Sequence, residues 1–132
     1  MRGFVPAIEQ LIAERKTHDG LDVTLEVLGE MNLPEEVNAG LFRIVQEALT
    51  NITKHAGTKQ AVVRLNLAGN SQYIEIEDQG IGFDLANRQN LPGHIGLSEM
   101  GARAEEIGWV LSIDTFPGGG ARLRVEKSMD EA

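Results

Sequence analysis

The chain has 132 residues, of which 42% are hydrophobic and 5% aromatic, which suits a single domain with one largely aliphatic core. It has no cysteine, so a disulfide framework, a thiolate metal site and a cysteine nucleophile are excluded. The formal net charge of −8 argues against a nucleic-acid partner, because an acidic surface repels phosphate backbones, but it leaves room for a small phosphate ligand at a locally positive site. No stretch approaches the roughly 20 apolar residues of a membrane span, and the N-terminal segment lacks the apolar core of a signal peptide.

The first half of the chain is predicted to hold two helices and one strand. Apolar side chains recur with helical spacing over Pro6–Lys16, and Gly20 closes that segment. Apolar and polar side chains alternate over Leu21–Leu28, which is typical of a half-buried strand. The pattern of Pro34–His55 predicts the longest helix of the chain, ended by Gly57.

The second half is predicted to be mostly strands. In chain order we expect strands Ala61–Leu67 and Gln72–Asp78 as a hairpin, a loop Gln79–Gly96, a helix Leu97–Ile107, and strands Trp109–Thr115 and Ala121–Lys127 joined by a glycine-rich turn. The loop is long for a compact domain, and long loops are usually functional. The elements together predict an α/β (α+β) two-layer sandwich, with a mixed five-stranded sheet covered on one face by about three helices.

A row of polar side chains borders the apolar side of the long predicted helix. Glu47, Asn51 and His55 are four residues apart, so they stack in one row. The Asn51 amide oxygen suits Mg²⁺, which prefers oxygen ligands, and Glu47 can orient a metal-bound water or act as a general base. Lys54 and His55 can meet phosphate oxygens. A solvated helix face shows the same spacing, so the row by itself leaves both interpretations open. The fully solvated side is predicted to carry Gln46, Thr50 and Thr53.

A first glycine-rich segment follows the strand that ends at Asp78. Gly80 and Gly82 come directly after it, and glycine lacks the Cβ that would keep a ligand away from the backbone. The Asp78 carboxylate can accept a hydrogen bond from an exocyclic amine such as that of adenine. A dinucleotide-binding motif needs a third glycine, which is missing here, so that interpretation is rejected.

A second glycine-rich segment, Gly93–Leu97, directly precedes the later predicted helix. The backbone amides at a helix N-terminus form a natural anion site, so a triphosphate could rest there. The alternative is a loop-to-helix junction with a glycine hinge.

Taken in order, these segments resemble the motifs of bacterial sensor histidine kinases. Leu41–Ala56 looks like their asparagine box, Asp78–Phe83 like their first glycine box, and Gly93–Leu97 like their second. The resemblance covers about Phe4–Lys127. It is strongest to the subfamily that pairs with response regulators carrying a LuxR-type helix-turn-helix.

The resemblance implies the ATP-binding fold shared with gyrase-type topoisomerases and heat-shock chaperone ATPases, with ATP and Mg²⁺ as cofactors. It implies that residues 1–20 are the tail of a joining region with a first helix, that residues 21–127 are the ATP-binding catalytic domain, and that residues 128–132 are a frayed tail. The implied partners are a dimerisation domain that carries the acceptor histidine, and a response regulator. We expect a cytoplasmic location, a monomeric isolated domain, and no contact of this domain with nucleic acid or membrane.

The resemblance also implies a role for each motif residue. Asn51 would hold Mg²⁺, Glu47 would assist at the metal or at the transferring phosphate, and Asp78 would accept from the adenine amine. The segment Asp84–Gly93 would be a short lid over the nucleotide. The other implied ATP-binding residues are Lys54, His55, Gly80, Gly82, Phe83, His94, Ile95, Gly96, Leu97 and Ala121.

Two positions depart from the family pattern. Ala121 stands where a threonine often supports the adenine contact, and Gly101 stands where an arginine is common. Both departures favour the alternative of a non-catalytic nucleotide-binding module, whereas the presence of Glu47 and Asn51 argues against it. A serine kinase of the anti-sigma factor type is a further alternative, which the wording of the motifs fits less well.

Overall fold

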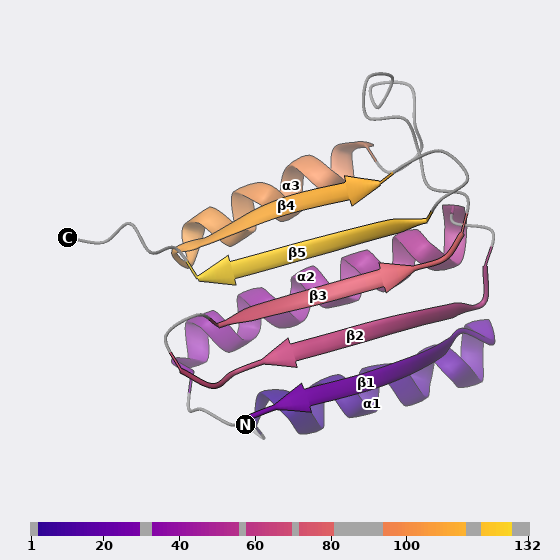
Figure 1. Cartoon of the computed structure of the whole chain (residues 1–132), viewed down its shortest axis with the longest axis horizontal. Coiled ribbons are helices and arrows are strands. Elements are labelled where there is room, and N and C mark those ends of the chain that lie inside the picture. Colours follow the sequence, from indigo (N-terminus) through magenta and orange to yellow (C-terminus); the bar gives the residue numbers. More distant parts are fainter. Residues whose placement is uncertain are drawn as a thin grey trace.

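One mixed sheet and a layer of helices form the described part of the chain. The computed structural model describes residues 3–29, 33–55, 58–69, 72–80, 94–115 and 120–127. Their elements are α1 (Phe4–Asp19), β1 (Asp22–Leu28), α2 (Glu35–His55), β2 (Gln60–Asn66), β3 (Tyr73–Asp78), α3 (His94–Glu106), β4 (Trp109–Thr115) and β5 (Ala121–Lys127). The sheet order is β1-β2-β3-β5-β4, and its one parallel pair is β1 with β2 (Figure 1).

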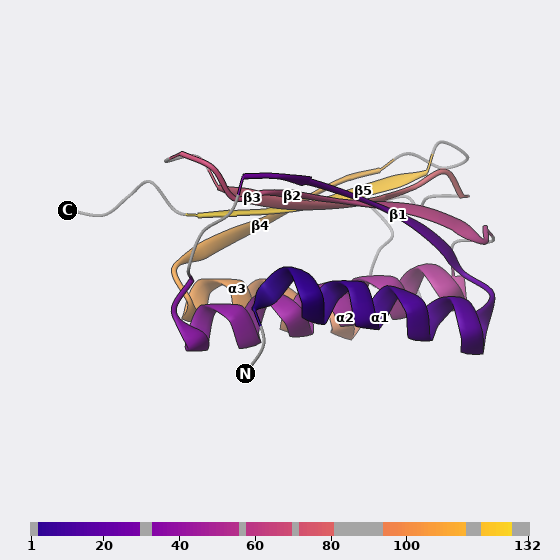
Figure 2. The same ribbon diagram turned by 90° about the horizontal axis from the view of Figure 1, so that it is seen from below.

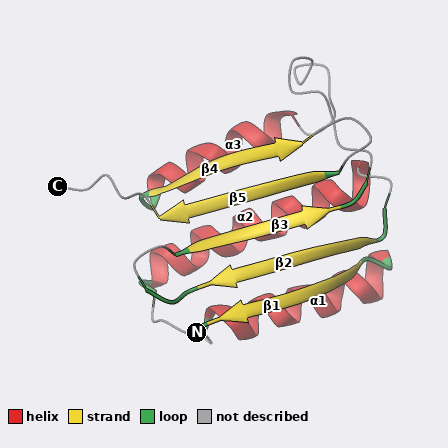
Figure 3. Ribbon diagram, viewed as in Figure 1, coloured by secondary structure: helices red, strands yellow, loops and turns green. Residues whose placement is uncertain are grey.

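The helices lie side by side on one face of the sheet, and the described residues place no helix on the other face (Figures 2 and 3). Parallel neighbours need a crossover connection, and α2 supplies it between β1 and β2. The expected two-layer sandwich with a mixed five-stranded sheet is therefore confirmed. None of the helices in the described ranges combines the length and the apolarity needed to span a membrane.

The predicted elements agree with the structure except at some ends. The predicted bounds of β4 and β5 are those observed, and β2 pairs with β3 as an antiparallel hairpin. The first helix is longer than expected, because it runs from Phe4 to Asp19 and ends at Gly20, whose φ is 71°. The loop expected to reach Gly96 ends earlier, since α3 begins at His94. Glycine lowers helix propensity, but a helix packed on a sheet tolerates one in its first turn.

The core lies between α2 and the sheet and is mostly aliphatic, as expected. On α2 the side chains of Leu41, Ile44, Val45 and Leu49 are all 0% exposed. Within the described residues, Phe4 and Trp109 are the two buried aromatic side chains.

The side of α2 that was predicted to be solvated is covered instead. Gln46, Thr50 and Thr53 are all half-buried, because α1 packs along this side of α2. The Arg15 guanidinium of α1 donates to the Thr50 hydroxyl at 2.8 Å and to the Asp19 carboxylate at 3.0 Å. The prediction was wrong because the pattern of one helix does not reveal a second helix that packs on its polar side.

The uncovered face of the sheet carries a network of alternating charges centred on Glu75. Arg124 donates to the Glu75 carboxylate at 2.6 Å, and Arg64 lies 3.5 Å from it. Arg64 also donates to the Glu77 carboxylate, and Arg124 also donates to the Glu126 carboxylate, each at 2.7 Å. Ion pairs therefore connect β2 with β3 and β3 with β5 on this face.

We expect the Glu75→Ala variant to unfold more easily than wild type by about 2 kcal/mol, because two arginines would lose a partner whose side chain is only 11% exposed. The control is Glu126→Ala, whose carboxylate pairs with Arg124 but is 48% exposed, so its loss should be below about 1 kcal/mol. Urea denaturation measures both free energies of unfolding. Equal losses in the two variants would contradict the expectation that Glu75 contributes more to stability than Glu126.

Candidate functional site

The fold brings the C-terminal part of α2 to the end of the sheet where β3 ends. Asp78 is the last residue of β3 and pairs with Ala61 at the start of β2. The chain reaches β2 directly from α2, which ends at His55 and is followed by Gln60 as the first residue of β2. The turns of α2 that carry Asn51 and His55 therefore lie at the Asp78 end (Figure 1).

The N-terminus of α3 lies at this same end of the sheet. Asp78 pairs with Ala121, and Ala121 pairs in turn with Thr115, the last residue of β4. The helix runs back along β4 and reaches Trp109 at the far end. Three segments that are far apart in the sequence thus meet at one end of the domain (Figure 1).

Asp78 is a buried carboxylate on the helix-facing side of the sheet. It lies two and four residues after the buried Ile76 and Ile74, so it shares their face of β3, and it is 6% exposed. Burial raises the pKa of Asp78 above its usual value, the hydrogen bond from the Gly80 N–H to Asp78 Oδ1 at 2.7 Å counteracts this, and the charge of Glu77 adds to the rise. The carboxylate is thus held in place yet poorly solvated, so a donor that reaches it would gain a strong hydrogen bond.

Two alanines flank Asp78 in the neighbouring strands. Ala61 of β2 and Ala121 of β5 stand directly opposite it in the register, and cross-strand partners present their side chains on the same face. Alanine side chains are small, so they take up little space beside the carboxylate. Sequence reasoning named Ala121 but missed Ala61, although the register of the predicted hairpin would have paired it with Asp78.

The polar row on α2 is only partly covered. Glu47 and Asn51 are half-buried, and Lys54 is exposed. His55 is the last residue of the helix, and its side chain lies outside the description. Glu47 and Asn51 are one helical turn apart, so they offer oxygen atoms at the border of the core.

The structure describes only some of the remaining predicted site residues. Gly80 is half-buried directly after β3, whereas Gly82, Phe83 and the expected lid lie outside the described residues. Gly101 faces β4, where an added Cβ would stand 3.8 Å from Leu111 Cδ2. For His94, Ile95, Gly96 and Leu97 only the backbone is described, and it forms the first turn of α3.

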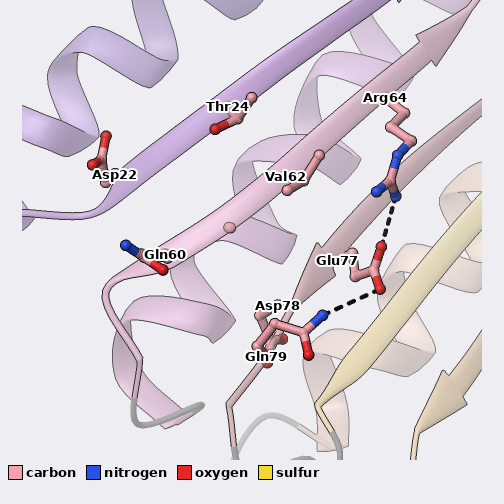
Figure 4. A pocket seen from close by; sticks show the side chains of 9 residues that line it. Asp22, Thr24, Gln60, Val62, Arg64, Glu77, Asp78 and Gln79 are labelled. Carbon is pink, nitrogen blue, oxygen red and sulfur yellow. Dashed lines mark hydrogen bonds and ion pairs between the residues drawn. The ribbon is translucent and has the colours of Figure 1, made fainter.

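A separate hollow of about 300 Å³ lies on the uncovered face of the sheet (Figure 4). Most of its lining residues, Asp22, Thr24, Gln60, Val62, Arg64, Glu77 and Gln79, lie on the face away from the helices, and Ala61 and Asp78 also line it. Arg64 and Glu77 are already paired with each other there. The polar row of α2 lies on the opposite side of the sheet, so the hollow shares Asp78 and Ala61 with the candidate site but not the residues of α2.

Comparison with known proteins gives consistent matches. The family profile described as "Histidine kinase-, DNA gyrase B-, and HSP90-like ATPase" matches residues 36–131. Sensor histidine kinase NarS of Mycobacterium tuberculosis is 29% identical over 89% of this chain, and sensor protein VraS of Staphylococcus saprophyticus is 33% identical over 99%. The chain spans 28% and 35% of the length of these two relatives.

Solved structures show the same fold at low sequence identity. The Acinetobacter baumannii histidine kinase AdeS matches with a TM-score of 0.76 and 12% identity, covering 98% of this chain and 66% of that one. The histidine kinase domain of the Erythrobacter litoralis blue-light activated kinase matches with a TM-score of 0.73 and 18% identity, covering 96% and 61%.

Proposed function

Because this chain belongs to the family of histidine kinase-, DNA gyrase B- and HSP90-like ATPases, we propose that it binds ATP and donates the γ-phosphate to a histidine on another domain. The observation that carries the proposal is the buried Asp78 carboxylate, which faces the helix layer between two alanines. A carboxylate placed in this way accepts a hydrogen bond from the exocyclic amine of adenine. Ala61 and Ala121 leave room beside it for the flat face of the base.

The phosphates would then extend from the base toward the two helices at this end of the sheet. The first turn of α3 has backbone N–H groups without partners inside the helix, and these favour an anion. Lys54 is exposed near the end of α2 and adds positive charge. Adenine at Asp78 and phosphates between the two helices make one continuous binding site.

The donor set on α2 fits Mg²⁺ that arrives with the nucleotide. In the described ranges no three His, Cys, Asp or Glu side chains gather to hold a metal ion, so an ion here would share its ligand positions with phosphate and water, as Mg²⁺ usually does. Asn51 would hold the ion, with Glu47 beside it. When bound, Mg²⁺ would neutralise charge on the phosphates.

In the transfer step, an imidazole nitrogen of the acceptor histidine bonds to the γ-phosphorus as the bond to the β-phosphate oxygen breaks, which leaves ADP. Glu47 is half-buried and would hold or accept the proton of that imidazole. The other residues of the site bind and orient the nucleotide, so positioning supplies most of the rate.

The partners we propose follow from the same family. The acceptor histidine would lie on a dimerisation domain, as expected for a kinase of this family. The next acceptor would be a response regulator, of the type with a LuxR-like helix-turn-helix. ATP supplies the phosphate in the first step and the phosphorylated histidine passes it on in the second, so we place the domain in the cytoplasm, where ATP is available.

The test is calorimetric titration of wild type and Asp78→Asn with ADP and with a non-hydrolysable ATP analogue, each with and without Mg²⁺. We expect the variant to bind at least about 10-fold more weakly, because an amide oxygen is a poorer acceptor than a carboxylate. Wild type that binds neither nucleotide would contradict the proposal. Binding without transfer to an added acceptor domain would favour the non-catalytic module instead.

The control is the stability of the Asp78→Asn variant without nucleotide. The raised pKa of Asp78 decides how the Tm difference between variant and wild type changes with pH. A carboxyl whose pKa is higher in the folded than in the unfolded protein favours folding when protonated, and this contribution is lost as the pH rises through the raised pKa. The amide in the variant does not ionise, so the Tm difference, Asp78→Asn minus wild type, should increase from about pH 4 to about pH 7. The weaker binding would then not result from unfolding.

A further inference from the structure

Gly120 lies so close to the end of β3 that an added Cβ would overlap its backbone. It lies directly before β5 and is buried, and its φ is 84°, in the left-handed region that favours glycine. A Cβ at this position would overlap the carbonyl oxygen of Asp78 and would stand 3.1 Å from Gln79 Cα. Two independent constraints, the backbone angle and the lack of space, therefore require glycine here.

The group that Gly120 touches is the backbone of the residue that we assign to adenine. Asp78 is the last residue of β3 and pairs with Ala121, the neighbour of Gly120. Its carboxylate accepts a hydrogen bond from the N–H of Gly80 at 2.7 Å. The direction of the carboxylate thus depends on where the Asp78 carbonyl sits, and Gly120 sets how closely β5 can approach it.

We propose that Gly120 is a positioning residue that sets the selectivity of the site for a purine with an exocyclic amine. This inference rests on the proposed function, because it assumes that Asp78 binds that amine. Hydrogen bonds weaken steeply outside a narrow range of distance and angle. A side chain at position 120 pushes the Asp78 backbone aside, so the carboxylate no longer meets the amine, whereas contacts to the sugar and phosphates persist.

Other glycines of the chain provide matched controls at the opposite end of the sheet. Gly29 has a φ of 76°, and a Cβ there would stand 2.6 Å from Ala68 Cβ, so it combines the same backbone angle with crowding. Gly108 has a φ of 80° and nothing within 4 Å of an added Cβ, so it tests the backbone angle alone.

The experiment compares two ligands that differ only in the amine. ADP and purine riboside diphosphate, which lacks the amine, are titrated into wild type, Gly120→Ala, Gly29→Ala and Gly108→Ala. We expect Gly120→Ala to bind ADP about 10-fold more weakly and the analogue almost normally, so the ratio of the two Kd values approaches one. Gly29→Ala and Gly108→Ala should keep the wild-type ratio even where they lower the Tm. A wild-type ratio in Gly120→Ala overturns the inference.

Asp78→Asn separates this inference from the proposed function. If wild type does not prefer ADP, or if Asp78→Asn keeps the preference, the adenine assignment itself fails. If Asp78→Asn loses the preference and Gly120→Ala keeps it, only the role of Gly120 fails.

If Gly120→Ala does not fold, a variant with D-alanine at position 120 still tests the inference. D-Alanine at position 120, introduced by joining a synthetic C-terminal peptide, favours positive φ and leaves the side facing Asp78 free. This variant should keep the wild-type ratio of Kd values. A folded D-alanine variant that has lost the ratio overturns the inference.

Discussion

The Asn51→Ala variant should transfer phosphate to an added histidine-acceptor domain at least about 100-fold more slowly than wild type. Asn51 is half-buried on the part of α2 that lies at the Asp78 end of the sheet, where we propose that its amide oxygen holds a cation against the phosphates. Alanine removes that oxygen but keeps a strong helix former in α2. The measurement is the initial rate of radiolabel transfer from ATP at saturating nucleotide.

A matched control exists on the same helix. Asn38 is also a half-buried asparagine of α2, but it lies about 20 Å along the axis from Asn51, at 1.5 Å per residue. Asn38→Ala should therefore transfer phosphate within about 2-fold of wild type. Calorimetry adds a second readout: Mg²⁺ should strengthen nucleotide binding to wild type and to Asn38→Ala, but not to Asn51→Ala. Equal transfer rates in the two variants would remove Asn51 from the catalytic site.

The second large effect concerns stability. Leu49→Ala should lower the free energy of unfolding by about 3 kcal/mol, because the Leu49 side chain is 0% exposed between α2 and the sheet and its loss leaves a cavity. For a domain of this size the expected fall in Tm is on the order of 10 °C. Thermal unfolding followed by circular dichroism measures the change.

The same substitution at an exposed site is the control. Leu28 ends β1 and is 63% exposed, so Leu28→Ala should change the free energy of unfolding by less than about 0.5 kcal/mol. Similar losses in both variants would mean that α2 is not the centre of the core. The comparison also shows whether the helix that carries Glu47 and Asn51 is held mainly by its apolar side.

The departures at two motif positions have different structural settings. Ala121 stands opposite Asp78, so a threonine there would put a hydroxyl beside the proposed adenine contact. Gly101 lies against β4, with Leu111 next to it. We therefore expect Ala121 to affect the affinity for the nucleotide and Gly101 to affect how α3 packs on the sheet.

Local patterns in the sequence were enough to predict the types of the helices and strands and which candidate residues share one side of a helix. Two strands joined by a glycine-rich turn were predicted with the observed bounds of β4 and β5, and helical spacing placed Glu47 and Asn51 in one row of α2. These features are local, because side-chain direction repeats every two residues in a strand and about every four in a helix. A short stretch of chain therefore contains the information that they need.

What packs against those elements is visible only in the folded domain. The packed chain shows that α1 covers Thr50, that Ala121 lies opposite Asp78, and that a side chain at position 120 would overlap the Asp78 carbonyl. Each of these contacts joins residues that are far apart in the sequence, so the periodic pattern of a single helix or strand does not predict it. The physical reason is that close packing depends on the shapes of segments from distant parts of the chain, which come together only when the whole domain folds.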